Sequence, residues 1–466
     1  MGEEIIKDIT SCSRIMNEFS SFHDRILRLN GQLISPSVSI EITKQDQYWI
    51  NCNDAIVSKD ILYSDKQNTL ETDNGFSFIF SSFSSTRVAG EKAMISTIVA
   101  DEVKYGNCDL CYYRAILPIK HLNPFSFELY DSKCYTQINE QRRNIILFSF
   151  ITCTIANEAF DIFKDEGFII IESKVKLGYE VFKTKVDYLL ECIGFFSGVF
   201  IHDECFCFSC DDSSFSRIIG IRYKKLSGSI QTDLTLISQE RELNEVIFPN
   251  RKADGFCSFI KQSVFDEMLN RLCEKETGRK LENLLFVLMY SSTYSLDTRS
   301  ICLSAAVEGM RRYLEATNAK ITKSHIIDKT NTDECKRFIN ALRSDFEGKI
   351  IDSYVNKCFR LNKPNDELLF EPFSLFEVSI DEKDKDAIKA RNTFLHGAMP
   401  SFDKVENKTI EVEAKKLSAL SIRQFSMCYI LLLKIIGYEG YIMNYRKLAD
   451  FMESSTTNDA DCMITI

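Results

Sequence analysis

The chain has 466 residues, of which 45% are hydrophobic and 27% charged, and its formal net charge is −10. This composition is ordinary for a soluble globular protein, and the length predicts two or three domains. The acidic balance argues against a protein that coats duplex nucleic acid along its surface, since such proteins are usually basic. A nucleic-acid partner therefore has to bind at a local patch.

The start of the chain and its cysteines indicate a cytoplasmic protein. No basic segment followed by an apolar one opens the chain (MGEEIIKDITSCSRIM), so we expect no secretory signal. The longest apolar run, 427–437, is interrupted by Lys434 and is too short to span a bilayer, so we expect no membrane segment. The 17 cysteines are accordingly expected to be reduced thiols.

The first half of the chain is typical of β-structure. Short runs in which aromatic and aliphatic residues alternate with polar ones predict strands at 75–86, 124–132, 205–210 and 215–223, and two strands within 167–182. One helix is predicted at 183–197, where apolar residues recur at helical spacing. Aromatic-rich strands at turn-like spacing predict an antiparallel sandwich or barrel for a domain over residues 1–250.

The pattern changes near 249–255 (PNRKADG), where we place the domain boundary. Beyond it the apolar period is helical, which predicts a helical bundle over 255–466 and an α+β protein of at least two domains. The segment 281–292 is apolar on all sides and is expected to be buried, and Gly437 is expected to end the last long helix. The predicted helices cover 256–275, 281–292, 296–317, 332–350, 383–397 and 414–437.

The helix at 383–397 carries unexpected residues on its apolar face. Counting from Ile388, the positions three, four and seven residues later are Arg391, Asn392 and Leu395, the usual buried stripe of an amphipathic helix. Burying a guanidinium without a partner costs on the order of several kcal/mol of folding free energy. This face therefore meets a buried carboxylate, or it lines a cleft or an interface. His396 falls in the last turn, before Gly397.

The stretch RNTFLHG resembles the R-N-x-x-x-H signature of the HEPN superfamily, helical bundles that include many RNA-cleaving toxins and defence nucleases. The resemblance covers about residues 280–440. The long helix with SAAVEGMRRYLE and the closing helix with IIGYEGY are similar to the ApeA-like branch, found in single-protein anti-phage systems. In that branch, too, a β-rich domain precedes the HEPN bundle.

The resemblance implies a metal-independent endoribonuclease with no cofactor, active as a homodimer or a higher oligomer. The two motif helices would form one composite cleft for RNA, with tRNA and mRNA as candidate substrates. His396 would act as acid or base at the ribose 2′-OH or the 5′-oxygen, Arg391 would stabilise the phosphorane, and Asn392 would orient the phosphate or the imidazole. The implied role is abortive anti-phage defence, with the β-rich domain sensing a phage-derived trigger.

Structural alternatives stay open for each of these residues. Arg391 would form a buried ion pair with Glu308, or Glu308 would position Arg391 for catalysis. Arg311 and Arg312 would hold RNA phosphates, or they would form a solvated basic pair. In the corresponding alternative function the protein is a non-catalytic dimeric binding or sensor protein, and its HEPN-like bundle is a dimerisation module.

A zinc site in the first domain is a further alternative. The sequence brings together one imidazole and a set of thiols: His202, Cys205, Cys207, Cys210 and the pair Cys108 and Cys111. The cysteines of 205–210 alternate with phenylalanines, as residues of a half-buried strand do. We therefore interpret them as small apolar side chains and expect no metal.

Overall fold

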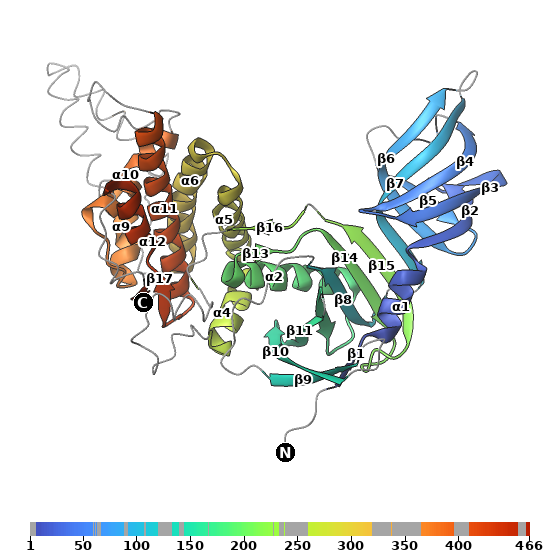
Figure 1. Ribbon diagram of the computed structural model, residues 1–466, viewed down its shortest axis with the longest axis horizontal. Helices are drawn as coiled ribbons and strands as arrows, with labels where there is room; N and C mark the ends of the chain where they lie inside the picture. Colours follow the sequence, from blue (N-terminus) through green and yellow to red (C-terminus); the bar gives the residue numbers. More distant parts are fainter. Residues whose placement is uncertain are drawn as a thin grey trace. The chain divides into compact units, whose positions relative to one another are not determined.

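The computed structural model describes residues 6–58, 67–87, 92–106, 109–119, 133–138, 144–165, 167–226, 228–232, 260–318, 365–395, 410–454 and 463–466, with four single residues between these ranges. The chain is an α+β protein, with strands in the first half and helices in the second (Figure 1). Two compact units are found: residues 1–231 with 259–273, and residues 232–258 with 274–466. The expected boundary at 249–255 lies outside the described residues.

Six antiparallel strands close into a barrel, one of the two forms expected, and further strands of the first half lie outside this barrel. They are β2 (Ser21–Leu29), β3 (Gln32–Lys44), β4 (Tyr48–Ser58), β5 (Asn68–Thr72), β6 (Phe76–Arg87) and β7 (Lys92–Gly106). Closure occurs because β7 pairs with both β4 and β6 (Figure 1). Phe76, Phe78 and Phe80 all point into the core, which confirms the strand predicted at 75–86.

The long strand β7 also starts a second, mostly antiparallel array. Its first part pairs with β4, whereas residues 102–106 pair with β15 (Ile218–Lys225). The order then continues through β14 (Glu204–Cys210), β8 (Tyr112–Pro118), β12 (Phe168–Ser173), β11 (Glu158–Asp165), β10 (Asn144–Ile155), β9 (Lys133–Ile138) and β1 (Ile6–Asp8). Where the end of β7 pairs with β15, a Cβ on Gly106 would lie 2.3 Å from the Ile219 carbonyl oxygen, so only glycine fits there.

One helix and two short strands also belong to this unit. Helix α1 (Thr10–Glu18) joins β1 to the barrel, and β13 (Val199–Phe200) pairs with β16 (Ile230–Gln231). The strands predicted at 205–210 and 215–223 are confirmed by β14 and β15. The strand predicted at 124–132 lies outside the described residues.

The prediction of two strands within 167–182 is wrong in its second half. Only β12 forms there, and helix α2 begins at Tyr179 and ends at Ser197. Apolar residues at helical spacing continue through this helix, and Phe182 and Val186 are buried on its inner face. The helical period over nineteen residues therefore outweighs the short alternation at its start. The helix predicted at 183–197 is confirmed, with an earlier beginning.

The first helix beyond the β-rich region belongs to the first compact unit. Helix α4 (Gln262–Cys273) forms within the predicted segment 256–275 and packs against α2 and β10. The Cys192 thiol of α2 donates to the Phe265 carbonyl, with a sulfur–oxygen distance of 3.8 Å.

The second unit is helical. It contains α5 (Gly278–Tyr290), the short 3-10 turn η2 (Ser291–Thr293), α6 (Leu296–Thr317), α9 (Asn365–Leu375), α10 (Glu382–Leu395), α11 (Ile410–Ile435) and α12 (Tyr445–Ser454). The short strands β17 (Tyr441–Met443) and β18 (Met463–Thr465) form an antiparallel pair, with α12 between them in the chain. Helix α6 packs against α5, α10 and α11, and α11 also packs against α12. The helices predicted at 281–292, 296–317, 383–397 and 414–437 are confirmed as far as they are described, whereas nearly all of 332–350 lies outside the described residues.

Two details of the helical prediction have different outcomes. Gly437 ends α11 as expected: its φ is +75°, and the N–H of Tyr438 donates to the Leu433 carbonyl at 2.9 Å, as in a Schellman motif. The expectation that α5 is buried on all sides is wrong, because Phe286 is 52% exposed. It stacks on Tyr290 one turn later, with ring centroids 4.0 Å apart. Each ring therefore shields part of the other from solvent outside the core.

One described helix, α11, is long and apolar enough to cross a membrane by length and composition. Of the apolar 18-residue stretch within Ala414–Ile435, 83% is buried inside the protein. Such burial is expected of the central helix of a folded bundle, and it leaves little apolar surface for lipid.

Candidate functional site

The candidate motif lies at the end of α10. Arg391 and Asn392 belong to the helical backbone of this element, and their side chains lie outside the described residues. His396 follows the last described residue of the helix and also lies outside the described residues. The structure therefore locates the motif through its helix and through the neighbours of that helix.

The inner face of α10 is defined by the two turns that precede the motif. Asp384, Ala387 and Ile388 are at most 3% exposed, whereas Lys389 lies on the solvent side. Because an α-helix repeats every 3.6 residues, Arg391 follows next on the face of Ala387 and Ile388. Ile388, from which the apolar spacing of this helix is counted, is therefore buried.

The beginning of α10 is fixed by a reciprocal cap. The backbone N–H of Asp384 donates to the Asp381 carboxylate at 2.7 Å, and the N–H of Asp381 donates to the Asp384 carboxylate at 3.2 Å. This is a capping box in which aspartate replaces the usual glutamate, and it satisfies two of the amide groups that a helix start leaves free. The sequence signal for this cap is the pattern Asp-x-x-Asp at the start of the helix.

Asp384 also binds two arginines, one from α11 and one from α12. Arg423 of α11 contacts its Oδ1 at 2.6 Å, and Arg446 of α12 contacts its Oδ2 at 3.1 Å. Burial raises the pKa of Asp384, although Arg446 and Arg423 act to lower it. Burial acts to lower the pKa of Arg423, but Asp384 and two further aspartates raise it more, so this guanidinium stays charged. Asp450 of α12 contacts Arg423 Nη2 at 2.7 Å and completes the cluster.

A second group of buried polar residues lies beside the ionic cluster of Asp384, about one turn further along α10. The carboxamide of Gln424 is fully buried, and its Nε2 donates to the Ala387 carbonyl of α10 at 2.8 Å and to the Ser304 hydroxyl of α6 at 3.1 Å. Ser300 of α6 and Ser421 of α11 share a hydrogen bond of 2.6 Å beside it. The pair Arg423–Gln424 lies in the mostly apolar segment 417–433 of α11 and was the sequence signal for both groups, because such residues are rarely buried without partners.

The secondary candidates Glu308, Arg311 and Arg312 all lie on α6. Arg312 has a side chain that is 71% exposed and an Nε atom 3.8 Å from Glu308. Arg311 is buried and forms an ion pair with Glu315, one turn later on the same helix. Of the two arginines, only Arg312 therefore fits the alternative of a solvated basic pair.

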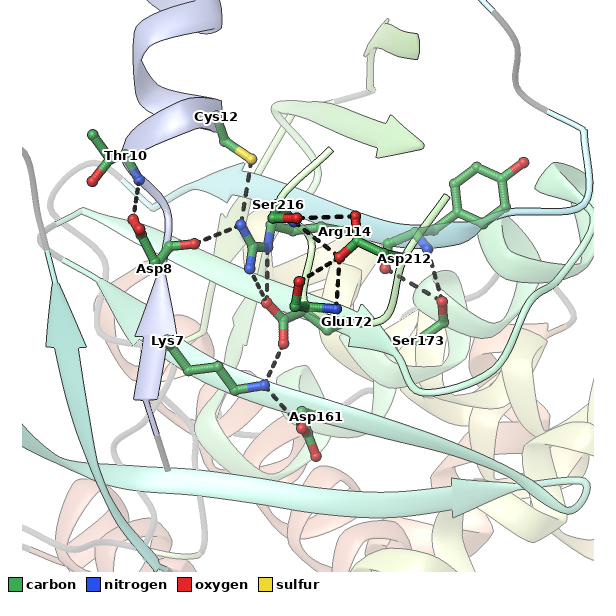
Figure 2. Close-up of polar contacts among 12 residues, drawn as sticks. Lys7, Asp8, Thr10, Cys12, Arg114, Asp161, Glu172, Ser173, Asp212 and Ser216 are labelled. Atoms are coloured by element: carbon green, nitrogen blue, oxygen red, sulfur yellow. Dashed lines mark hydrogen bonds and ion pairs between the residues drawn. The ribbon is translucent and has the colours of Figure 1, made fainter. Parts of the chain in front are cut away.

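The β-rich unit contains a buried ionic cluster that the sequence did not predict (Figure 2). Asp161 of β11 and Glu172 of β12 lie directly opposite each other across the two strands. The Lys7 ammonium of β1 contacts both carboxylates, at 3.0 Å from Asp161 Oδ2. Arg114 of β8 binds Glu172 through Nε at 2.8 Å and Nη2 at 2.6 Å. All four side chains are at most 13% exposed.

Arg114 also holds the segment that leads to α1. Its Nη1 donates to the Asp8 carbonyl at 2.9 Å and lies 3.5 Å from the Cys12 sulfur, as Figure 2 shows. No local sequence signal pointed to this arrangement, since Lys7 lies 165 positions before its partner Glu172. The cluster fastens the start of the chain to the second array of strands.

The thiols proposed for zinc are placed mainly in strands. Cys207 of β14 pairs with Ala115 and Arg222 on its two sides, and burial raises the pKa of Cys205 to about 12. Burial in such surroundings favours the protonated thiol. Cys108 lies outside the described residues, and the part of the chain that the structure describes contains no group of three or more His, Cys, Asp or Glu arranged to hold a metal ion.

A shallow pocket lies beside the same strand. Helix α2 covers strands β8 and β14 there, and the apolar lining includes Leu117, Phe182 and Leu190. At its rim, Lys183 and Asp187 pair at 2.6 Å across one turn of α2, so the two opposite charges satisfy each other. Cys205 and Cys207 of β14 also line the pocket, and burial keeps the pKa of the Cys205 thiol high.

Comparison with known proteins gave no match, whether with family models, with curated proteins or with solved structures.

Proposed function

We propose that this protein is a metal-independent endoribonuclease of the HEPN type, with Arg391, Asn392 and His396 as catalytic residues. The observation that carries the proposal is the buried inner face of α10, where Asp384, Ala387 and Ile388 precede Arg391 on the same side of the helix. An arginine and an asparagine at the end of such a face need polar partners. A second copy of the same helix, together with bound RNA, would supply them.

The proposed chemistry uses each motif residue for one task. His396 removes the proton from a ribose 2′-OH, or donates one to the departing 5′-oxygen. Arg391 stabilises the additional negative charge of the pentacovalent phosphorane through paired N–H donors. Asn392 orients the phosphate or the imidazole. The 2′-oxygen bonds to phosphorus as the bond to the 5′-oxygen breaks, which leaves a 2′,3′-cyclic phosphate and a 5′-OH.

The surroundings of α10 suit such a site. The capping box and the contacts of Arg423 and Arg446 with Asp384 hold the beginning of the helix against α11 and α12. A functional group is most precise when its supporting element is rigid. Homodimerisation through this helical unit would place two motifs in one cleft, and tRNA or mRNA would be the substrate.

The biological role that we propose is abortive anti-phage defence in the cytoplasm. A ribonuclease that cuts cellular RNA harms its own host, so its activity has to be gated. The β-rich unit is the proposed sensor of a phage-derived trigger.

The test is RNA cleavage in the presence of EDTA. Wild type, Arg391→Ala, His396→Ala and the control Lys389→Ala would be incubated with total RNA and tRNA, with and without a lysate of phage-infected cells as the source of the trigger. Lys389 lies on the exposed side of the same helix, so its variant should keep wild-type activity. We expect 2′,3′-cyclic phosphate ends from wild type and Lys389→Ala alone. Equal cleavage by all four proteins would mean that a contaminant or another site cuts the RNA, and no cleavage with the lysate would favour the non-catalytic binding protein.

A further inference from the structure

The side chain of Gln424 joins three helices at a point close to the proposed catalytic motif. It is fully buried in α11, and its Nε2 donates to α10 through the Ala387 carbonyl at 2.8 Å and to α6 through the Ser304 hydroxyl at 3.1 Å. A single amide group therefore fixes the position of α10 relative to two neighbouring helices.

The carbonyl that Gln424 binds has a particular place in α10. In an α-helix the N–H of each residue donates to the carbonyl four positions earlier, so the Ala387 carbonyl is the acceptor for the N–H of Arg391. Gln424 thus holds the peptide group on which the turn with Arg391 and Asn392 is built. A shift at this carbonyl would move the backbone of both residues.

Stability alone does not explain a glutamine here. Its Oε1 is buried and has no hydrogen-bond partner among the described residues, and an unpaired buried acceptor costs free energy. An apolar side chain of the same length would avoid this cost and would still fill the space between the helices. The residue is therefore better explained by what its Nε2 positions.

We propose that Gln424 is a positioning residue for the reaction of the ribonuclease proposed above, on which this inference rests. It acts through the Ala387 carbonyl, by fixing the turn of α10 that presents Arg391 and Asn392. Small displacements of catalytic groups reduce the rate strongly, by as much as about 100-fold for 1 Å. The binding of RNA elsewhere in the cleft would be unaffected.

The first arm of the test compares Gln424→Met with Ser421→Ala. Methionine keeps the length and flexibility of glutamine but removes both donated hydrogen bonds. Ser421 lies three residues earlier on α11 and joins α6 alone, through Ser300 at 2.6 Å, so its variant is the matched control. We expect Gln424→Met to lower kcat at least about tenfold, with KM unchanged and the melting temperature not lowered. Ser421→Ala should keep the wild-type kcat. A purely structural glutamine would lower the melting temperature and leave kcat unchanged.

The second arm does not depend on activity. Hydrogen exchange of the α10 amides is measured by mass spectrometry for wild type and both variants. We expect Gln424→Met to speed exchange in 388–395 relative to 383–387, and Ser421→Ala to leave it unchanged. Unchanged exchange in Gln424→Met, or a wild-type kcat in that variant, would overturn the inference. If the wild type cuts no RNA, the proposed function fails by itself, and the exchange data alone decide whether Gln424 fixes this turn.

Discussion

Replacing Lys7 by methionine should destabilise the β-rich unit strongly, because this lysine contacts two buried carboxylates and Arg114 balances the charge of only one of them. At 3.0 Å from Asp161 and an effective dielectric constant of about 20, one such contact is worth about 5 kcal/mol before desolvation. Removal of one partner of a buried ion pair typically costs about 3–5 kcal/mol. Without Lys7, Asp161 and Glu172 face each other directly across β11 and β12. We therefore expect a loss of about 3–5 kcal/mol in the free energy of unfolding.

The matched control is Lys174→Met. Lys174 contacts the same Asp161 at 3.5 Å, but its side chain is 50% exposed, so its removal should cost less than about 1 kcal/mol. Urea denaturation followed by fluorescence isolates this unit, because the single tryptophan of the chain, Trp49, lies in β4 of the barrel. Equal losses in the two variants would refute the reasoning, since the buried cluster would then contribute no more than a surface pair.

Three further outcomes follow from the structure. Asp384→Asn removes the charge that Arg423 binds at 2.6 Å and should cost about 3 kcal/mol in denaturant unfolding, with Lys389→Ala near zero. Gly437→Ala should lower the free energy of unfolding by about 1–2 kcal/mol, because a residue with a Cβ is strained at the φ of +75° found here. No atom lies within 4 Å of the added Cβ, so a steric clash does not contribute. An unchanged free energy of unfolding would exclude backbone strain at this position. Burial lowers the pKa of His202 below its ordinary 6.5, with Asp187 opposing, so its neutral form is favoured in the folded protein. The contribution of His202 to the free energy of unfolding is therefore fully present above pH 6.5 and is lost as the pH falls through the lowered pKa. His202→Gln should make the free energy of unfolding less dependent on pH between pH 7 and 5. An unchanged pH dependence in this variant would contradict the prediction.

The strongly periodic helices could be predicted from the sequence alone. Helix α6 occupies 296–317, the predicted segment, because its apolar spacing and its burial within the bundle agree. Gly437 was predicted as a helix end because glycine alone adopts a positive φ without cost. The aromatic alternation at 75–86 likewise predicted a strand, since period two places every second side chain in one core.

The tertiary structure decided how these elements combine. Local sequence does not show that β7 closes a barrel with β4 and then continues along β15, because both pairings join segments far apart in the chain. It also does not show that Lys7 and Arg114 meet the carboxylate of Glu172. For the candidate site, the sequence determined which residues of α10 carry the motif. Only packing decided that Gln424 and Arg423 of α11 hold that helix, because hydrogen bonds and ion pairs depend on distance in space and not along the chain.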